Sequence, residues 1–599
     1  MTAKVNLPPK AEEILEGVAE NEGPKPKQAD ILIALGRKAV LFHSPAPERE
    51  AFAHLQVADH FETLRVRGEF RKWLRHAYFE ATGQGCNSEA MQIAVETLAS
   101  IAEFSGEERE VSTRIAEHHG AIYIDIGDAS WRAIEVTASG WKVIDAPPVH
   151  FRRSASTRPL PLPQGGGSIK DLRPFVNAKS DTDFVLLVSY IAAALRPRAN
   201  YPILVVTGQQ GSAKTWTACL VVRFVDPREP DRRSMPREED NLIVAAKTAH
   251  LPSFDNLSRL AAEISDALCR LSTGGGAGKR RLYSDDDEVL FSGKRPIVLN
   301  GITDFATSAD LLDRVVFLTL EPITDTARRD ERELGDEIAA AAPKIFGALL
   351  DGLVAGLREV DRISIPDKPR MADFALWGEA CSRAWWPAGT FIKAYRQNRA
   401  SAVELSIEAS PVASAVRSFM RDRTNWSGTA EQLLKVLSEK VSEQTARAKS
   451  WPTLPRELGG ELRRAAPNLA KVGIAIAWDK GRHYGRLIHI SKTNGTDPDH
   501  RPNLASPASP ASPPGVERDG GDDGDGVLST QAVEARSPAA EPTCHRCGVP
   551  GNATHGQLIR AGRDGAAGHY HPRCWTEERT KGPRRRGSPD RRPALGPEG

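Results

Sequence analysis

The feature that most constrains the fold is a short segment in mid-chain, where an apolar run leads through a glycine-bearing turn into a second apolar stretch. Residues 203–206 are all apolar and predict a buried strand, whereas residues 217–225 have the spacing of a helix with one apolar face. Strand and helix candidates continue to alternate over residues 168–360, which predicts an α/β fold built on a parallel sheet.

The turn between that strand and helix comes close to the phosphate-binding pattern G-x-x-x-x-G-K-[ST]. Small residues in such a loop let backbone N–H groups converge on phosphate oxygens at the start of a helix. Lys214 would reach the β- and γ-phosphates, and the Thr215 hydroxyl would bind Mg²⁺. The turn therefore predicts a site for ATP and Mg²⁺; an ordinary strand-turn-helix with a surface lysine is the alternative. The predicted loop residues are Gly208, Gly211, Ser212, Ala213, Lys214 and Thr215.

Ala213 departs from the pattern, which has a glycine immediately before the lysine. That glycine often adopts a positive or crowded backbone angle, which a side chain disfavours. We therefore expect the Ala213 methyl group to cost some stability without preventing the loop from forming.

The composition describes a soluble protein of several domains. A chain of 599 residues exceeds what one core can hold, and its length indicates about three or four domains. The formal charge is +2, so any contact with nucleic acid must come from local basic patches. The sequence has neither an apolar leader nor an uninterrupted apolar stretch of about 18 residues, so we expect a cytoplasmic protein with no membrane contact.

Composition and periodicity also predict where the domains begin and end. Prolines and the Gly165-Gly-Gly-Ser168 run mark a linker, and residues after 493 are too poor in apolar side chains to form a core. The predicted segments are disordered residues 1–29, an α+β domain at 30–160, a P-loop ATPase domain with a helical extension at 168–400, a winged-helix domain at 405–492, a disordered linker at 493–540, a zinc-binding module at 541–580 and a basic disordered tail at 581–599.

Within these domains the apolar patterns predict individual elements. Short antiparallel strands are expected at 121–126, 131–136 and 141–144. The central domain is expected to hold a helix at 180–195 and further strands at 242–246, 251–254, 296–299 and 315–320.

Asp255 is the candidate acidic partner of the phosphate loop. It follows an apolar stretch, and a carboxylate there would help to hold Mg²⁺. Asn256 comes next, where many P-loop hydrolases have a glutamate that polarises the attacking water, so the general base is unassigned; Glu263 and Asp266 are possible substitutes. In the alternative interpretation, the Asp-Asn pair caps the following helix.

Three further signals follow along the chain. The glycine-rich segment 271–283 predicts a hairpin that would present Lys279, Arg280 and Arg281 to phosphates. Asn300 ends a buried strand and would orient the attacking water. Arg314 precedes the last strand, and an arginine at a subunit edge can complete a neighbouring subunit's site, which predicts a homo-oligomeric ring.

The order of these elements resembles the superfamily-three helicases, above all those linked to primases in phages, poxviruses and integrative elements. In that family the segment that matches 271–283 supplies a hairpin facing DNA, and the asparagine that matches Asn300 senses the nucleotide. The resemblance implies an AAA+-like ring ATPase that acts on nucleic acid.

Residues 121–490 are also similar to a group of P-loop proteins of bacterial mobile elements. In that group Ser-Ala-Lys-[Ser/Thr] is usual, so Ala213 resembles a family variant. The matching segments are Tyr123-Ile-Asp-Ile-Gly-Asp128, Pro147-Pro-Val-His-Phe-Arg152, Gly211-Ser-Ala-Lys-Thr215, Asp255-Asn-Leu-Ser258, Leu299-Asn-Gly-Ile302 and Pro369-Arg-Met-Ala-Asp-Phe374.

Residues 405–492 form a basic unit in which the predicted order of elements is that of a winged helix. Helices are expected at 429–444 and 455–465, and strands at 472–478 and 486–491, around a basic tip. Positive charge on the second helix and the wing suits contact with DNA phosphates, although winged helices also bind proteins. The candidate contacts are Arg463, Arg464, Lys480 and Arg482.

Near the end of the chain, C-x₂-C and H-x₂-C half-sites have the spacing of a structural zinc site. Four closed ligands imply a structural role for Zn²⁺, and a chance cluster is the alternative. The ligands would be Cys544, Cys547, His571 and Cys574, with His545, His555 and His569 as alternative nitrogen ligands.

Two functions fit this sequence. One is an ATP-driven motor on nucleic acid, in replication or mobilisation of a phage or integrative element. The other is a nucleotide-gated DNA-binding scaffold or initiator with little turnover, which Asn256 favours because it is not a base.

Overall fold

The computed structural model describes residues 27–274, 277–280, 288–291, 293–301, 309–448, 450–479, 487–493, 559–563 and 566–570. The chain divides into two compact units, residues 1–502 and 503–599. In the second unit the described residues form one antiparallel pair, β20 (Ile559–Arg563) with β21 (Ala566–Tyr570). The segments predicted to be disordered, except residues 27–29 and 493, and the four predicted zinc ligands lie outside the described residues.

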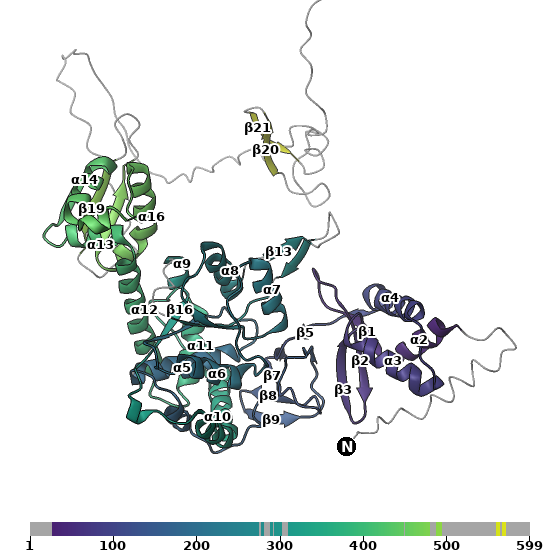
Figure 1. Ribbon diagram of the computed structural model, residues 1–599. Helices are drawn as coiled ribbons and strands as arrows, with labels where there is room; N and C mark the ends of the chain where they lie inside the picture. Colours follow the sequence, from purple (N-terminus) through teal and green to yellow (C-terminus); the bar gives the residue numbers. More distant parts are fainter. Residues whose placement is uncertain are drawn as a thin grey trace, which may run out of the picture. The chain divides into compact units, whose positions relative to one another are not determined.

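The first domain has a core of its own, which includes Leu32, Phe70 and Met91. Its sheet has the strand order β3-β2-β1-β4, with β1 and β4 parallel and the other pairs antiparallel. Its elements are α2 (Gln28–Gly36), β1 (Val40–His43), β2 (Ala51–Val57), β3 (His60–Arg65), α3 (Glu69–Thr82) and α4 (Ser88–Ser105) (Figure 1), together with the short strand β4 (Glu107–Glu108).

A second sheet follows, and it confirms the short antiparallel strands predicted between 121 and 144. Its order is β6-β7-β8-β9, each strand antiparallel to the next, and a separate short pair joins β5 to β10. The bounds are β5 (Val111–Ser112), β6 (Ile115–His118), β7 (Ala121–Asp125), β8 (Ala133–Thr137), β9 (Gly140–Ile144) and β10 (His150–Phe151).

The linker expected near 160–168 does not separate two cores. Ile122 and Ile134 of the second sheet belong to the same core as the central helices, so β6–β9 are packed with the central domain. The proline- and glycine-rich segment lies against a central helix, because Gln164 N donates to Pro343 O at 2.9 Å. A β-carbon on Gly347 would lie 1.9 Å from Gln164 O, so glycine permits this close contact. The proline- and glycine-rich composition of residues 160–168 therefore marks a segment that packs closely against a helix, and not a flexible linker.

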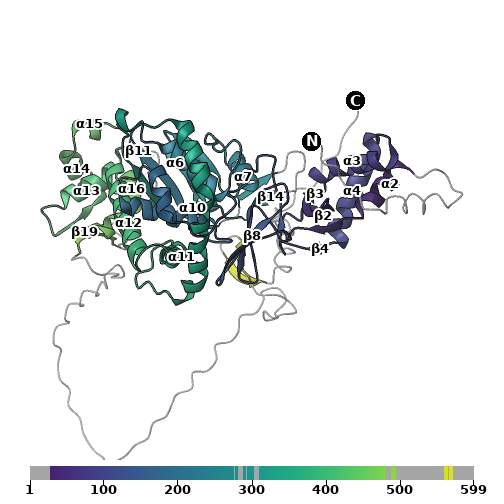
Figure 2. The same cartoon turned by 90° about the horizontal axis from the view of Figure 1, so that it is seen from below.

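The predicted parallel sheet is confirmed, with the strand order β12-β15-β11-β16. Successive residues of β11 point to opposite faces: Leu204 and Val206 join one core, whereas Ile203 and Val205 join the other. Helices cover both faces, and Figure 2 shows α6 and α10 beside β11. The elements are η1 (Ile169–Phe175), α5 (Asp181–Ala194), β11 (Ile203–Gly208), α6 (Lys214–Val225), α7 (Glu239–Thr248), β12 (Ser253–Leu257), α8 (Ala262–Thr273), β13 (Ala277–Arg280), β14 (Glu288–Phe291), β15 (Ile297–Gly301), α9 (Ala309–Leu312) and β16 (Val315–Leu320).

The strand predicted at 242–246 is wrong, because these residues lie in the helix α7. Leu242, Ile243, Ala245 and Ala246 are buried, with the i, i+3, i+4 spacing of a helix that packs on the sheet. The acidic residues in its first turn favour the start of a helix, but the short apolar run that follows is equally typical of a strand. β12 begins two residues later than predicted, so Asp255 lies within the strand.

A helical extension completes the central domain: η3 (Asp325–Ala327), α10 (Glu331–Glu359), η4 (Val360–Arg362), α11 (Ala372–Ser382) and α12 (Thr390–Ala409). By length and composition alone, the helical stretch Glu331–Arg362 is the one candidate membrane span among the described residues. However, 61% of its most apolar window is buried inside the protein, and Ile345, Phe346 and Leu349 lie in the central core. It is therefore packed as the core helix of a folded domain.

The last domain of the first unit confirms the predicted helices and strands in their order, although the helix expected at 429–444 is interrupted at residues 441–442. The predicted basic turn lies outside the described residues. An additional strand, β17, precedes the first of these helices, and the sheet order is β17-β19-β18, all antiparallel. α12 joins the two domains, since Tyr395 packs in the central domain and Ile407 packs in the core of this one. The elements are α13 (Pro411–Phe419), β17 (Asn425–Thr429), α14 (Ala430–Lys440), α15 (Glu443–Ala446), α16 (Pro455–Lys471), β18 (Ile474–Trp478) and β19 (Leu487–Lys492).

Candidate nucleotide site

The predicted phosphate loop joins the end of β11 to the start of α6, and its backbone requires small residues. Gly208 has φ 155° and Gly211 has φ 76°, both in the region that favours glycine. A β-carbon on Gly208 would lie 2.5 Å from Ser212 Oγ and 2.8 Å from Leu320 O. The buried Ser212 hydroxyl donates to Gln209 O at 2.8 Å, which closes the turn.

Ala213 has the positive backbone angle expected at its position. It is the residue before α6, with φ 62° and ψ 33° in the left-handed region. For a residue with a β-carbon this conformation costs about 1–2 kcal/mol relative to the right-handed one. The loop therefore keeps the glycine geometry in spite of the methyl group.

Lys214 and Thr215 form the first turn of α6 at the mouth of the loop. Lys214 Nζ donates to Gly208 O at 2.9 Å and to Gln209 O at 2.7 Å, so the ammonium group lies over the loop backbone. Burial lowers the pKa of Lys214, and the Asp255 carboxylate acts in the opposite direction. A cation at a helix N-terminus beside a glycine-bearing loop suits an anion such as phosphate.

The two predicted Mg²⁺ ligands lie together. Thr215 Oγ1 is 3.3 Å from Asp255 Oδ1 and 3.4 Å from Asp255 Oδ2. The Asp255 side chain is 21% exposed, so water and a cation can reach it. A hydroxyl and a carboxylate are hard oxygen donors, and Mg²⁺ in nucleotide sites is usually held by one or two such groups together with water and phosphate. The donor set therefore fits Mg²⁺.

Arg232 is a residue of this site that sequence analysis missed. Its Nε lies 3.1 Å from Asp255 Oδ2, and its Nη1 lies 3.3 Å from Cys219 Sγ on α6. Its neighbour Arg233 exchanges backbone hydrogen bonds with β12, through Ser253 O and Asp255 N. That pairing at the sheet edge brings Arg232 to Asp255, and a single basic residue in a loop gives no local signal of it.

Asn256 and Asn300 are linked at the same edge of the sheet. Asn256 has φ 59°, and its backbone N–H donates to Asn300 Oδ1 at 3.0 Å. Asn300 is 2% exposed, and its buried Nδ2 has no hydrogen-bond partner within the described part of the chain. This amide is therefore free to donate to a group at the end of β15.

The alternative in which Asp255 and Asn256 cap the next helix is wrong. Both residues lie in β12, and the residue that precedes α8 is Ala261, which provides no side-chain cap. The proposed substitute bases, Glu263 and Asp266, lie on α8 and are exposed.

Arg314 lies at the other end of the sheet from the loop. Residue pairing in register joins Ile203 to Val315 and Gly208 to Leu320, so the residue before β16 is remote from the carboxyl edge. The Arg314 side chain is 11% exposed and forms an ion pair with Asp310. Its Nη1 also donates to Asp310 O at 2.8 Å, and its Nε lies 3.4 Å from Thr273 Oγ1. The structure thus brings Lys214, Asp255 and Asn300 together, but not Arg314.

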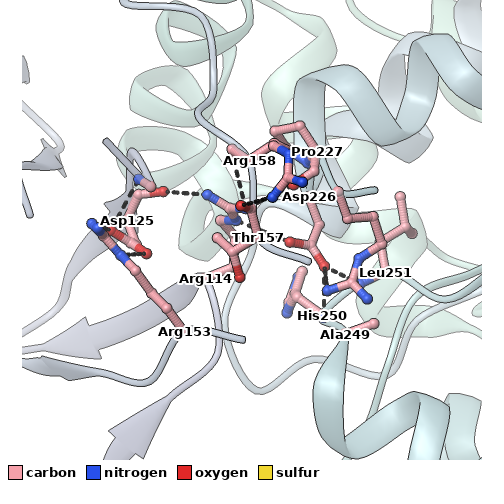
Figure 3. A network of polar contacts seen from close by, with 12 residues as sticks. Arg114, Asp125, Arg153, Thr157, Arg158, Asp226, Pro227, Ala249, His250 and Leu251 are labelled. Atoms are coloured by element: carbon pink, nitrogen blue, oxygen red, sulfur yellow. Dashed lines mark hydrogen bonds and ion pairs between the residues drawn. The ribbon is translucent and has the colours of Figure 1, made fainter. Parts of the chain in front are cut away.

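The far end of α6 is held by a buried charge cluster, shown in Figure 3. Asp226 follows the helix and is 1% exposed. Arg114 Nε donates to its Oδ1 at 3.0 Å, while the backbone N–H of His250 donates to its Oδ2 at 2.8 Å. Arg114 also donates to carbonyl groups of Asp125, Ile126, Arg158 and Pro227.

These contacts tie the second sheet to both the phosphate helix and the segment that enters β12. Burial alone would raise the pKa of Asp226, but Arg114 and Arg228 outweigh it and hold that pKa below its usual value. Arg228 Nη2 lies 3.3 Å from Asp226 Oδ2. The sequence contains no local sign of this cluster, because its members come from three distant segments.

The predicted nucleic-acid contacts are described only in part. β13 pairs with β14 in antiparallel register, which confirms a hairpin with Lys279 and Arg280 in its first strand. The predicted bounds of 271–283 are wrong, because residues 271–273 belong to α8 and the second strand is 288–291. Arg463 and Arg464 are exposed on α16. Arg281, Lys480 and Arg482 lie outside the described residues, as do Cys544, Cys547, His571 and Cys574. Within the ranges that the structure describes, no group of three His, Cys, Asp or Glu residues has the arrangement of a metal site.

Two family models match the middle of the chain. Residues 169–406 match the model of the actinomycete integrative conjugative element replication protein, and residues 412–507 match the C-terminal domain of the same protein. No curated protein matches the chain.

Two solved structures are similar at low identity. The SCCmec type IV Cch active helicase is 11% identical, covers 76% of this chain and 93% of its own, and has a TM-score of 0.40. The apo A form of the NrS-1 C-terminal region is 11% identical, covers 78% of this chain and 98% of its own, and has a TM-score of 0.33. Scores this low do not establish a shared fold, so the architecture rests on the strand order and register described above.

Proposed function

We propose that this replication protein of an actinomycete integrative conjugative element binds ATP with Mg²⁺ and hydrolyses it to move on DNA. The family is given by the matches over residues 169–406 and 412–507. The observation that carries the proposal is the approach of Thr215 Oγ1 to both oxygens of Asp255, at 3.3 and 3.4 Å, beside Lys214. Few arrangements other than a Mg²⁺-nucleotide site need a hydroxyl, a carboxylate and a lysine at the mouth of such a loop.

Each residue has a role in this proposal. The backbone of the loop and Lys214 hold the phosphate chain, while Thr215 and Asp255 hold Mg²⁺, Asp255 through water. Bound Mg²⁺ would neutralise negative charge on the phosphates. Asn300 presents its unpartnered Nδ2 at the end of β15, where it would donate to the γ-phosphate or to the attacking water.

Arg314 would act in a neighbouring subunit of a homo-oligomeric ring. Its place at the amino end of β16, remote from the loop of its own chain, supports a role in trans over one in cis. The ion pair with Asp310 would have to open for the guanidinium to reach another subunit. An arginine supplied in trans can stabilise the charge of the transition state strongly.

The last domain of the first unit would contact DNA as a winged helix. The order of its helices and its three-stranded sheet supports this proposal, and α16 carries the exposed Arg463 and Arg464. Arg463 and Arg464 on α16, with Lys480 and Arg482 on the wing, would bind phosphates with little sequence preference. Lys279, Arg280 and Arg281 of the hairpin would face DNA in the motor itself. Cys544, Cys547, His571 and Cys574 would hold a structural Zn²⁺, and the protein would be cytoplasmic.

The decisive experiment compares ATPase turnover with and without single-stranded DNA, for wild type and Lys214→Ala. We expect turnover that DNA stimulates and that Lys214→Ala abolishes, while the exposed lysine variant Lys368→Ala behaves as wild type. ATP binding without turnover under either condition would refute the motor.

A nucleotide-gated DNA-binding scaffold is the second candidate, and Asn256 is the observation that favours it. The residue after Asp255 carries no acidic side chain, and its backbone is fixed to Asn300. In this case ATP would order the assembly and DNA binding would depend on ATP without measurable hydrolysis.

The shared site is tested by mixing Arg314→Ala with Lys214→Ala. Each variant alone is expected to be inactive, and the mixture is expected to regain activity, because some interfaces would join an intact Lys214 to an intact Arg314. No gain on mixing, with both variants folded by circular dichroism, would contradict the role in trans.

A further inference from the structure

The segment that follows β16 returns to the phosphate loop. β16 ends beside the loop, since Gly208 pairs in register with Leu320. Ile323 N then donates to Gly211 O at 3.3 Å, and Arg328 directly follows the short helix η3. Residues 321–328 therefore lie along the same edge of the sheet as the loop itself.

Arg328 directly adjoins the loop backbone. A β-carbon placed on Gly211 would lie 3.3 Å from Arg328 Nη2. The side chain is 61% exposed, and its ion-pair partner is Asp325, 3.3 Å away and itself 90% exposed. Exposed ion pairs of this kind contribute little, so the guanidinium is free to turn to a stronger anion.

A phosphate chain in the loop would be such an anion. Gly211 lies within the turn whose backbone N–H groups would face the phosphates. A triphosphate carries several negative charges, and Lys214 is the one cationic side chain of the same subunit that the proposed function places on it. The planar guanidinium group can donate two parallel hydrogen bonds to phosphate oxygens, which an ammonium group cannot.

We propose that Arg328 binds the phosphate chain of the nucleotide held by the loop of its own chain. This inference rests on the proposed function of that loop. It gives the two arginines that flank β16 different roles: Arg314, at the amino end, is largely buried against Asp310, whereas Arg328, beyond the carboxyl end, is open and touches the loop.

The test measures ATP and AMP binding by calorimetry, in the presence of Mg²⁺, with the full chain. Arg328→Ala is expected to weaken ATP binding by about tenfold, the effect of losing one charge-assisted hydrogen bond, and to leave AMP binding unchanged. The matched control is Arg329→Ala, since Arg329 is the adjacent residue but pairs with Glu337. That variant is expected to bind both nucleotides as wild type does. Arg328→Lys is expected to lie between Arg328→Ala and wild type.

The outcomes separate this inference from the proposed function. If Lys214→Ala loses ATP but Arg328→Ala keeps it, Arg328 has no role at the phosphates and the proposed function stands. If Arg328→Ala weakens ATP and AMP equally, the role in binding the phosphate chain is overturned. If the wild-type protein binds no ATP, the proposed function and this inference fail together.

Discussion

Two aspartates at opposite ends of the helix α6 each pair with arginine, yet they have different surroundings. Asp226 follows the last turn and is 1% exposed, with Arg114, Arg228 and two backbone N–H groups on its oxygens. Asp255 faces the first turn, where its side chain is 21% exposed and its contacts with Thr215 are long.

The difference indicates which carboxylate is structural and which is available for chemistry. Asp226 lies at the carboxyl end of a helix, where a negative charge is unfavourable, so it needs the two buried arginines to remain ionised. Asp255 is partly exposed, and the contacts of its oxygens are two long ones with Thr215 and one with the half-exposed Arg232, so a cation can still bind to it. Both aspartates pair with arginine. They differ in how many hydrogen-bond donors surround the carboxylate oxygens.

The largest expected effect is on stability, from Asp226→Asn. The variant keeps the shape of the side chain but leaves Arg114 and Arg228 as uncompensated buried charges, which should cost about 3–5 kcal/mol. The measurement is the free energy of unfolding of the first unit in urea. Asp255→Asn is the matched control and should change it by less than about 1 kcal/mol. Equal losses for the two variants would remove the distinction between the two aspartates.

The next effect concerns pH, through His250 in the same cluster. Burial lowers the pKa of His250 to about 4, and Arg295 acts in the same direction. The unfolded chain takes up this proton near pH 6.5, so the folded state is most stable above pH 6.5 and loses stability as pH falls toward 4. The loss attributable to this fully buried group is about 3 kcal/mol.

His250→Gln isolates that contribution, because glutamine can still donate to Ala194 O but does not titrate. Unfolding free energies of the two proteins should converge as pH falls from about 6.5 to 4. His150, whose pKa is also lowered to about 4, titrates in both proteins and therefore cancels in the comparison. Parallel curves would show that His250 does not respond to pH in this way.

Asp255→Asn should have its main effect on Mg²⁺. Loss of the carboxylate is expected to raise the Mg²⁺ concentration for half-maximal turnover by about tenfold or more, equivalent to about 1.4 kcal/mol. Asp336→Asn, which removes an exposed carboxylate on α10, serves as the control and should not shift it. An unchanged Mg²⁺ dependence in Asp255→Asn would place the metal ligand elsewhere.

The sequence predicts the partly exposed site around Asp255 much better than the buried cluster around Asp226. The loop, Asp255 and Asn300 each stand at the end of an apolar run, and parallel strands bring such ends to one edge. The Asp226 cluster joins residues from three distant segments, and its buried arginines have no periodic pattern. Arg232 and Arg328 escape prediction for the same reason, since their positions depend on how loops return to the sheet.

Local patterns also fail where an apolar run is too short to show a period. Leu242 to Ala246 is short and entirely apolar, so a strand and a helix give the same sequence signal there, although Val244 of this helix is exposed. The packing of α7 on the sheet decides between them. Similarly, glycine and proline at 160–168 predict a linker, but these residues permit close packing against α10.

The smallest expected effect is that of Ala213→Gly, in the phosphate loop, where the backbone of Ala213 has a positive φ. Glycine adopts φ 62° without a steric penalty, so the variant relieves about 1–2 kcal/mol, although the greater freedom of glycine in the unfolded chain offsets part of it. We expect a net gain of less than about 1 kcal/mol in unfolding free energy and unchanged ATP binding. Ala340→Gly in α10 is the opposite control, because an exposed helical position should lose about 1 kcal/mol. A loss in both variants would mean that Ala213 is not strained, and that the loop tolerates its methyl group without cost.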